Sequence, residues 1–230
     1  RDVLALTWRF TTLCGADEIV PAFASLAHKA GLQNVRIAAD RAPPRQVMRA
    51  GTSAIEAIVT FETAQGRGSG IVRLVADENG APKAWTLLTA LDEIKGHEEK
   101  LGRERPRGEA YSRDFRGPNW LDLRQGAREY ADRDPEVRVV GGGQAGLTIA
   151  ARLTQLGIDT LIVDREERIG DNWRKRYHAL TLHNQVQVNH LPYMPFPPNW
   201  PTYIPKDKLA NWFEAYVEAM ELNFWTSTDF

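Results

Sequence analysis

Hydrophobic positions near the start of the chain predict one amphipathic helix. From Ala16 to Ala30, apolar side chains such as Ile19, Phe23 and Leu26 recur every three or four residues. That spacing places them on one face of a helix, because an α-helix turns once in 3.6 residues. The pattern therefore predicts a helix over this segment, with an apolar face that needs a partner.

Alternating apolar and polar positions then predict an antiparallel sheet. Residues 55–61 and 85–91 alternate, and residues 71–76 form a further extended run. We interpret Gly66-Arg67-Gly68-Ser69-Gly70 as a flexible turn between the first two runs, and Asn79-Gly80 as the next turn. The segments together predict a three-stranded antiparallel meander.

The helix and the meander form a predicted α+β domain over residues 1–95, with one helix on an antiparallel sheet. Residues 96–134 follow as a predicted linker. Its first part is rich in charged residues, contains Pro106 and has little to bury. A short helix is predicted from Trp120 to Tyr130.

A strand, a glycine-rich turn and a helix then follow in that order. The β-branched run Val137–Val140 leads directly into Gly141-Gly142-Gly143-Gln144-Ala145-Gly146, after which apolar residues continue at helical spacing. A second apolar run, Thr160–Val163, ends in Asp164. This order is typical of a doubly wound α/β fold. We predict an α/β Rossmann-type dinucleotide-binding domain over residues 135–230.

The glycines and the acid have separate roles in such a turn. Gly141 permits the tight turn, Gly143 lets the backbone approach a pyrophosphate, and Gly146 lets the helix pack closely on the strand. Asp164 follows Gly146 by 18 residues, close to the spacing of about 20 for a ribose-binding acid. A carboxylate there repels a 2′-phosphate, so FAD or NAD is expected rather than NADP. The candidate cofactor-binding residues here are Gly141, Gly143, Gln144, Ala145, Gly146, Asp164 and Arg165.

Further elements are predicted at the end of the chain. From Pro205 onward, Leu209, Phe213 and Tyr216 repeat at helical spacing, which predicts a helix whose aromatic face belongs to the core. Residues 222–225 form a β-prone run where a third parallel strand would fit beside the second.

Composition and charge exclude several classes of protein. The chain has 230 residues, is 43% hydrophobic and 26% charged, and carries a net charge of −1. Intrinsic disorder and nucleic-acid binding are therefore not expected. Cys14 is the single cysteine, so no internal disulfide and no multi-cysteine metal site are expected, and a cytoplasmic location fits. Ala179–Pro205 lacks charged residues but contains six prolines, so no membrane span is expected. Because the chain begins at Arg1, we interpret it as a fragment or a trimmed product.

The region after Asp164 resembles the class B flavoprotein monooxygenases. That family comprises the flavin-containing monooxygenases, including the plant auxin-forming branch, and their Baeyer–Villiger relatives. Gly170-Asp171-Asn172-Trp173 matches its Gly-x-x-Trp element, and Pro195-Phe196-Pro197 matches its Pro-Phe-Pro turn. The resemblance covers roughly residues 135 to 230. It implies an α/β Rossmann-type FAD-binding domain there, incomplete at its C-terminus.

The resemblance implies further site residues for FAD. Gly170 and Trp173 should lie along the cofactor, and Leu182-His183-Asn184 should run close to the isoalloxazine ring. The family often has Asn where this chain has His183, so either His183 or Asn184 could face the flavin. No second glycine fingerprint follows, so the NADPH site is expected outside this chain. No catalytic residue is assigned.

The resemblance also implies a reaction for the complete protein. NADPH reduces the flavin, O2 adds at the flavin C4a, and the resulting (hydro)peroxide transfers one oxygen atom to a small organic substrate. The chain alone is expected to be inactive. Two alternatives stay open: a pyridine-nucleotide-linked flavoprotein reductase, against which the absence of a CxxC motif weighs, and a non-catalytic binding or assembly module.

The first domain is similar to the cone-shaped nuclear-transport-factor-2-like (NTF2-like) domains in the order of its elements. The likeness rests on pattern rather than on a motif. It implies a role in docking, in ligand binding or in forming a homodimer through the sheet.

Overall fold

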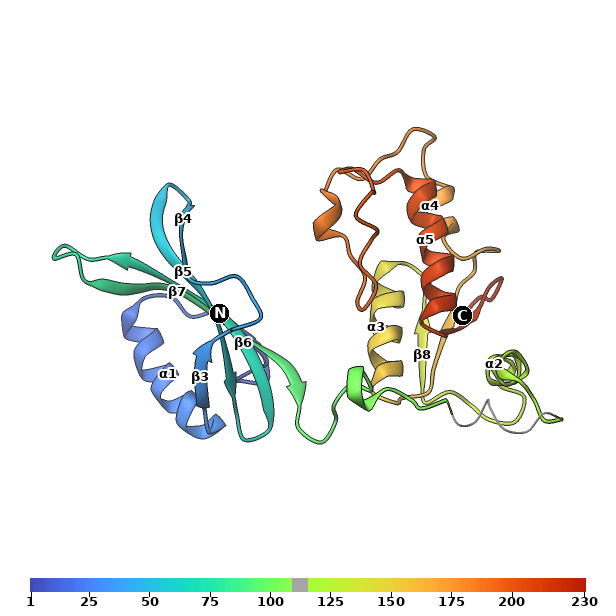
Figure 1. Ribbon diagram of the computed structural model, residues 1–230, viewed down its shortest axis with the longest axis horizontal. Helices are drawn as coiled ribbons and strands as arrows, with labels where there is room; N and C mark the ends of the chain where they lie inside the picture. Colours follow the sequence, from blue (N-terminus) through green and yellow to red (C-terminus); the bar gives the residue numbers. More distant parts are fainter. Residues whose placement is uncertain (109–115) are drawn as a thin grey trace. The chain divides into compact units, whose positions relative to one another are not determined.

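The structure is a computed structural model that describes residues 1–108 and 116–230 (Figure 1). The chain divides into two compact units, Arg1–Glu98 and Glu99–Phe230. Among the helices in these described residues, none has the length and apolar character that crossing a membrane requires.

The first unit is one sheet with one helix on it. Its strand order is β2-β1-β7-β6-β5-β3, and β4 also pairs with β5. Neighbouring strands run antiparallel, except that β1 and β7 are parallel. The strands are β1 (Asp2–Val3), β2 (Phe10–Thr11), β3 (Gln33–Ile37), β4 (Arg45–Arg49), β5 (Thr52–Glu62), β6 (Gly66–Ala76) and β7 (Pro82–Ile94).

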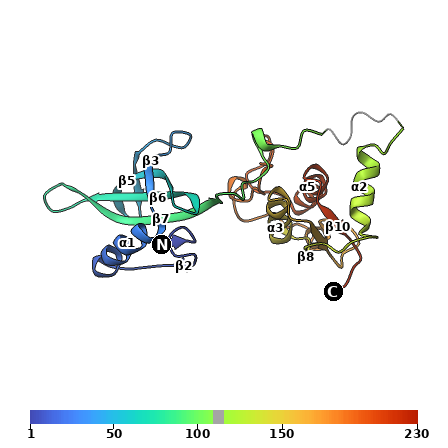
Figure 2. The same cartoon turned by 90° about the horizontal axis from the view of Figure 1, so that it is seen from below.

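Helix α1 (Ala16–Ala30) has the predicted bounds and packs on this sheet (Figures 1 and 2). It ends at Gly31, whose φ of 63° is the left-handed conformation that glycine adopts without a steric penalty. Phe23 and Leu26 pack against a small buried cluster that includes Phe61 of β5. The periodicity therefore predicted this helix correctly, because its apolar stripe has one partner surface.

The glycine-rich segment of the first unit is a strand and not the predicted turn. Residues 66–70 begin β6, and the hairpin turn is the shorter segment Thr63–Gln65. At Gly68 a Cβ would lie 2.5 Å from the Ala90 carbonyl oxygen and 2.5 Å from the ring of Phe61. Glycine is present because the neighbouring strand and a buried aromatic ring approach too closely for any side chain.

The alternation along β5 is also only partly as predicted. Ile55 was expected on the buried face, but its side chain is 49% exposed, whereas Glu56 is 6% exposed. Burial of a carboxylate is possible because arginines from two neighbouring strands bind it. Strands β3 and β4 were not predicted, and most of their residues are exposed.

The second unit is a parallel sheet covered by helices. Its strand order is β10-β9-β8, and the third parallel strand lies beside the second, as predicted. The elements are the 3-10 helix η1 (Gly102–Glu104), α2 (Trp120–Glu129), β8 (Val137–Val140), α3 (Gln144–Gln155), β9 (Thr160–Val163), α4 (Asp171–Arg174), the 3-10 helix η3 (Val186–Val188), α5 (Lys206–Ala219) and β10 (Asn223–Trp225).

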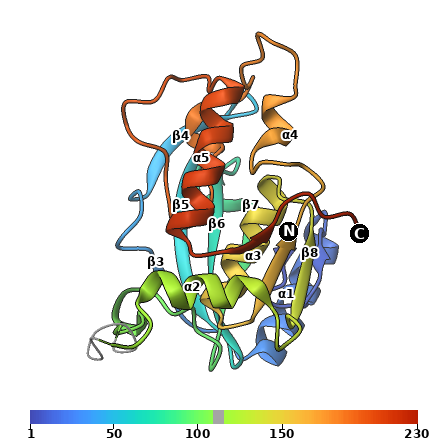
Figure 3. The ribbon, with the colours of Figure 1, turned by 90° about the vertical axis from the view of Figure 1, so that its right-hand side faces the viewer.

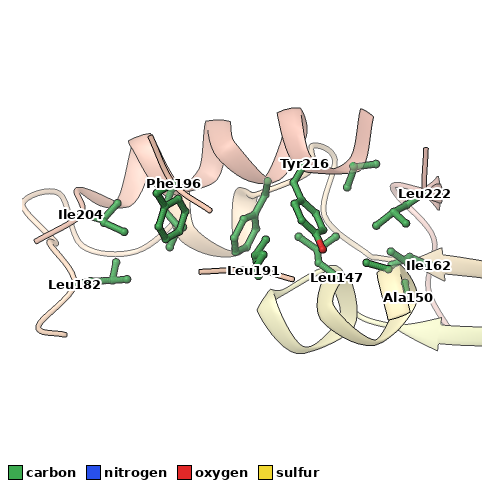
Figure 4. Close-up of a cluster of buried hydrophobic side chains, with 13 residues drawn as sticks. Leu147, Ala150, Ile162, Leu182, Leu191, Phe196, Ile204, Tyr216 and Leu222 are labelled. Carbon is green, nitrogen blue, oxygen red and sulfur yellow. The ribbon is translucent and has the colours of Figure 1, made fainter. Parts of the chain in front are cut away.

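The main core of this unit lies between α3, α5 and one face of the sheet (Figures 3 and 4). Leu147 of α3, Ile162 of β9 and Tyr216 of α5 are fully buried in it. The Tyr216 hydroxyl donates to the Pro192 carbonyl oxygen at 3.0 Å, which satisfies its polar end. The predicted aromatic face of α5 is therefore confirmed as core.

Helix α2 packs on the same unit beside β10. The Trp120 indole donates to Glu221 at 2.8 Å, and the Trp225 indole donates to the Arg128 carbonyl oxygen at 2.7 Å. The helix begins with a reciprocal capping box between Asn119 and Asp122. The short helix predicted within the linker thus belongs to the second unit. Residues 109–115 of the predicted linker lie outside the described residues.

Candidate dinucleotide-binding site

The glycine turn closes the carboxyl end of β8 and opens α3. Gly141 N–H donates to the Val163 carbonyl oxygen at 2.8 Å, and its φ is 98°, a conformation that favours glycine. At Gly146 a Cβ would overlap the Gly141 carbonyl oxygen. The backbone therefore requires glycine at both positions, because α3 begins directly after the end of β8 and packs closely against it.

The amino end of α3 is open to an anion. Gly143 is the N-cap residue, and among the described residues no side chain caps the helix. The N–H groups of Gln144, Ala145 and Gly146 belong to the first turn, where a helix has no internal acceptors and its dipole is positive. Such a terminus is a ready binding site for phosphate oxygens.

Gly143 differs from its neighbours because the protein leaves room beside it. A Cβ there would meet only the Nδ2 atom of Asn172, at 3.2 Å. A side chain at this position would therefore occupy space in front of the helix terminus, where a pyrophosphate would approach, rather than space that the core needs.

Asp164 is held at the end of β9 with its carboxylate facing the turn. Its Oδ2 accepts a hydrogen bond from Gly142 N–H at 2.5 Å, and its Oδ1 accepts from Glu166 N–H at 2.9 Å. The side chain is half-buried. Two oxygens offer about four acceptor positions, so the carboxylate can still accept from two hydroxyl groups.

Backbone contacts from the last residues of the chain fix the same place. Asp164 N–H donates to the Trp225 carbonyl oxygen at 2.9 Å, and Thr228 N–H donates to the Asp164 carbonyl oxygen at 2.9 Å. The ring of Phe224 occupies the space that a Cβ on Gly142 would need. Strand β10 therefore supports both the acid and the glycine turn.

The Gly-x-x-Trp element lies next to the turn. The Trp173 indole donates to the Gln144 side chain at 3.1 Å, which joins α4 to the first residue of α3. Gly170 has a φ of 89°, and a Cβ there would lie 2.5 Å from the Ala210 carbonyl oxygen of α5. Gly170 is thus needed for close packing of α4 on α5, while Trp173 lies at the edge of the glycine turn.

Ion pairs hold α4 on α5. Arg174 pairs with Asp171 at 3.1 Å and with Glu214 of α5 at 3.2 Å. The buried Lys206 amine donates to the Arg174 carbonyl oxygen and to Asp207, each at 2.8 Å. This network positions the short helix that carries Trp173.

Asn172 is a site residue that sequence reasoning did not single out. Its Oδ1 atom is buried and has no hydrogen-bond partner among the described residues, and its Nδ2 atom lies beside Gly143. A buried polar atom without a partner is costly in a folded protein. The only sequence signal was its position inside the Gly-x-x-Trp element. Three features are therefore compatible with a bound dinucleotide: the uncapped amino end of α3, the open space at Gly143 and the unpartnered amide oxygen of Asn172.

The remaining predicted residues are exposed, and among the described residues none of their side chains is hydrogen-bonded to the glycine turn. Arg165 is exposed directly after Asp164. His183 and Asn184 are exposed in the loop before η3. The backbone carbonyl oxygen of Asn184 accepts a hydrogen bond from the Asn189 side chain. Among residues 116–230, no hydrogen bond joins the His183 or Asn184 side chain to the glycine turn. The structure brings together Gly141, Gly143, Gln144, Ala145, Gly146, Asp164 and Trp173.

Comparison with known protein families places this site within a recognised domain. Residues 139–199 match the NAD(P)-binding Rossmann-like domain. That stretch covers the end of β8, the glycine turn, Asp164, Trp173 and the Pro-Phe-Pro turn.

The same part of the chain is similar to oxidoreductases. It is 37% identical over 86 residues to the indole-3-pyruvate monooxygenase YUCCA1 of Oryza sativa subsp. japonica, covering 37% of this chain and 21% of that protein. An uncharacterized CzcO-like oxidoreductase of Geobacillus kaustophilus is 37% identical over 94 residues, covering 41% of this chain and 27% of that protein.

A solved structure gives a partial match. The flavin-containing monooxygenase from Stenotrophomonas maltophilia is 26% identical, with a TM-score of 0.37, and the match covers 40% of this chain and 28% of that chain. The chain thus spans about a fifth to a quarter of the curated relatives named above. Residues 139–199 are thus similar to a Rossmann-like NAD(P)-binding domain, and the chain has relatives among monooxygenases over this part of its length.

Proposed function

We propose that these residues belong to an FAD-dependent, NAD(P)H-using monooxygenase and supply the adenosine and pyrophosphate part of its FAD site. The observation that carries the proposal is the position of Asp164 against the glycine turn, with its carboxylate bonded to Gly142 N–H and acceptor positions left over. Similarity to the indole-3-pyruvate monooxygenase and to the CzcO-like oxidoreductase supports the class of reaction.

Each residue of the site has a binding role in this proposal. The amino end of α3 holds the pyrophosphate, and Gly143 leaves the backbone accessible to it. Asp164 accepts hydrogen bonds from the ribose hydroxyls and excludes a 2′-phosphate by charge, which favours FAD over NADP at this turn. Trp173 and Asn172 border the same space.

The reaction itself belongs to the cofactors of the complete protein. When bound, the flavin supplies electron transfer and the activation of O2. NADPH binds outside these residues and provides the hydride, and the substrate is a small organic molecule. The contribution of this chain is to bind and orient the adenosine half of the flavin.

The first unit has a separate proposed role. Its helix on a mostly antiparallel sheet supports an NTF2-like assignment, and its exposed sheet residues suit a homodimer contact. We also propose a cytoplasmic location, which is supported by the presence of a single cysteine, Cys14.

Substitution of Asp164 by Asn tests the proposed ribose contact. Asn removes the charge from the ribose hydrogen bonds, each of which contributes roughly 1.5–3 kcal/mol when the acceptor is ionised. FAD affinity of the complete protein should therefore fall at least about tenfold. Titration of the apoprotein with FAD, followed by flavin fluorescence, measures this.

The matched control is Asp134→Asn, which removes the same charge from an exposed position before β8. It should leave FAD affinity unchanged. Unchanged affinity in Asp164→Asn, with normal thermal unfolding, would show that Asp164 does not contact the ribose.

A further inference from the structure

Three arginines converge on one buried carboxylate in the sheet of the first unit. Arg45 of β4 lies opposite Glu56 of β5, and Glu56 lies opposite Arg73 of β6. Arg49 lies four residues after Arg45 on the same strand, so it shares that face of the sheet. We call Arg45, Arg49, Arg73 and Glu56 the arginine cluster.

Each arginine of the arginine cluster donates at least one hydrogen bond to Glu56. Arg45 donates to Glu56 Oε1 at 3.1 Å, and Arg49 donates to both carboxylate oxygens at 3.3 Å. Arg73 donates to Oε2 at 2.8 Å. Hydrogen bonds from Arg73, Arg49 and Arg45 lower the pKa of the Glu56 carboxyl to about 2, so the group is ionised at neutral pH.

The arginine cluster carries more positive charge than the carboxylate can balance. Three guanidinium groups face one carboxylate, which leaves a surplus of two charges. Among the described residues, no other carboxylate pairs with these arginines. The Glu56 side chain is 7% exposed, whereas those of Arg45 and Arg49 are 53% and 44% exposed. The buried carboxylate therefore holds the guanidinium groups in place, and the exposed parts of Arg45 and Arg49 remain accessible to solvent.

We propose that the arginine cluster is a binding site for the phosphate monoester group of a small molecule. A guanidinium presents parallel N–H donors that match two phosphate oxygens, and such bonds are among the strongest in proteins. A phosphate monoester carries about −1.5 to −2 charge at pH 7, which matches the surplus of two charges. It concentrates that charge on one tetrahedral group, which fits a single cluster better than a dicarboxylate does.

The arrangement is preorganised for such an anion. Glu56 holds the three side chains in one place before any ligand arrives, so less rotamer entropy is lost on binding than for free surface arginines. The Thr86 side chain, on an exposed residue opposite Arg73 in the next strand, offers a further hydroxyl on the same row. This site is in the first unit and does not depend on the proposed FAD site.

Titration calorimetry with phenyl phosphate, at pH 7.5 and low salt, tests the proposal on the 230-residue chain. Phenyl sulfate, which has the same ring and a single negative charge, is the matched ligand. Phenyl phosphate should bind saturably at one site, at least about tenfold more tightly than phenyl sulfate. The double variant Arg45→Gln/Arg49→Gln should lose at least tenfold in affinity for phenyl phosphate, while Glu56 keeps Arg73 as its partner.

Arg9→Gln is the matched control variant, since Arg9 is exposed in the same unit and outside the arginine cluster. It should bind phenyl phosphate as the original chain does. If the double variant does not fold, Arg45→Gln alone serves, because that side chain is the most exposed of the three.

Three results would overturn the proposal. The first is the absence of saturable binding, and the second is equal affinity for phenyl sulfate, which would indicate general attraction of anions. The third is binding to phosphatidic acid vesicles without binding to phenyl phosphate, which would point to a lipid surface instead of a small molecule.

Discussion

The glycines in the dinucleotide turn and at the start of α4 differ in what surrounds them. Gly146 and Gly170 are packed against backbone carbonyl oxygens, so the fold requires them. Gly143 has open space except for the Asn172 amide at 3.2 Å. A substitution at Gly143 can therefore report on the ligand without unfolding the protein.

We predict that Gly143→Ala leaves stability nearly unchanged and lowers FAD affinity more than Asp164→Asn does. The added methyl group occupies the space in front of the α3 terminus, where the pyrophosphate must approach. Urea unfolding measures the stability, and FAD titration of the apoprotein measures the affinity.

Gly146→Ala provides the contrast at the same turn. Its methyl group would overlap the Gly141 carbonyl oxygen, so this variant should unfold at a clearly lower urea concentration. Normal FAD affinity in a folded Gly143→Ala variant would contradict the assignment of the pyrophosphate to this turn.

Helix α2 shows how an element from a charged, weakly hydrophobic segment is held in place. Tryptophan and arginine side chains of α2 form hydrogen bonds with residues in and next to β10. Arg124, for example, donates to the Asn223 side chain at 3.0 Å. Burial is the main reason that the pKa of Arg124 is lowered. The helix therefore depends on tertiary contacts more than on its own sequence.

We predict that Gly126→Ala raises the free energy of unfolding of the second unit by about 0.5–1 kcal/mol. Gly126 lies inside α2, and among the described residues no atom outside the adjacent residues and the helix's own backbone lies within 4 Å of the position of an added Cβ. Alanine lowers the entropy of the unfolded chain without a clash. Urea unfolding followed by tryptophan fluorescence measures the change, and a loss of stability would show that α2 does not pack as described.

The elements that could be predicted from sequence have a clear apolar pattern and clear ends. Helix α1 ends at Gly31, and β8, α3 and β9 are marked by the glycine turn and Asp164. Strand β3 could not be found in this way, because every residue in it is exposed and leaves no alternation to detect. The start of β6 was missed because glycines needed for close strand contact have the same composition as a turn.

The candidate site also contains residues that could be predicted from sequence and residues that could not. Gly141, Gly146 and Asp164 follow from spacing, since their roles depend on local backbone geometry. Asn172 and Phe224 could not be assigned, because their contacts with the turn arise only when α4 and β10 are packed in place. Tertiary contacts of this kind have no signature in one sequence.

At the scale of the whole molecule, the matched region is a small part of the relatives. The curated relatives match this chain over 21% and 27% of their own lengths, and the sequence contains one glycine fingerprint. A monooxygenase of the proposed class also needs a site for its hydride donor. We therefore propose that the 230 residues hold the adenosine half of the FAD site and that NADPH binds outside them.

We predict that the 230-residue chain alone has no monooxygenase activity and binds FAD weakly or not at all. NADPH oxidation and oxygen uptake, with added FAD and a panel of amines, thioethers and ketones, measure the activity. Substrate-dependent turnover by the purified chain would contradict the assignment of the NADPH site to residues outside it.

The nucleotide released from the complete protein tests the central claim most directly. The protein is purified aerobically and denatured, and the released nucleotide is separated by chromatography and identified by its spectrum and mass. Our account predicts a yellow protein that releases FAD, with Gly143→Ala releasing much less. A colourless protein that releases NAD and no flavin would contradict the account.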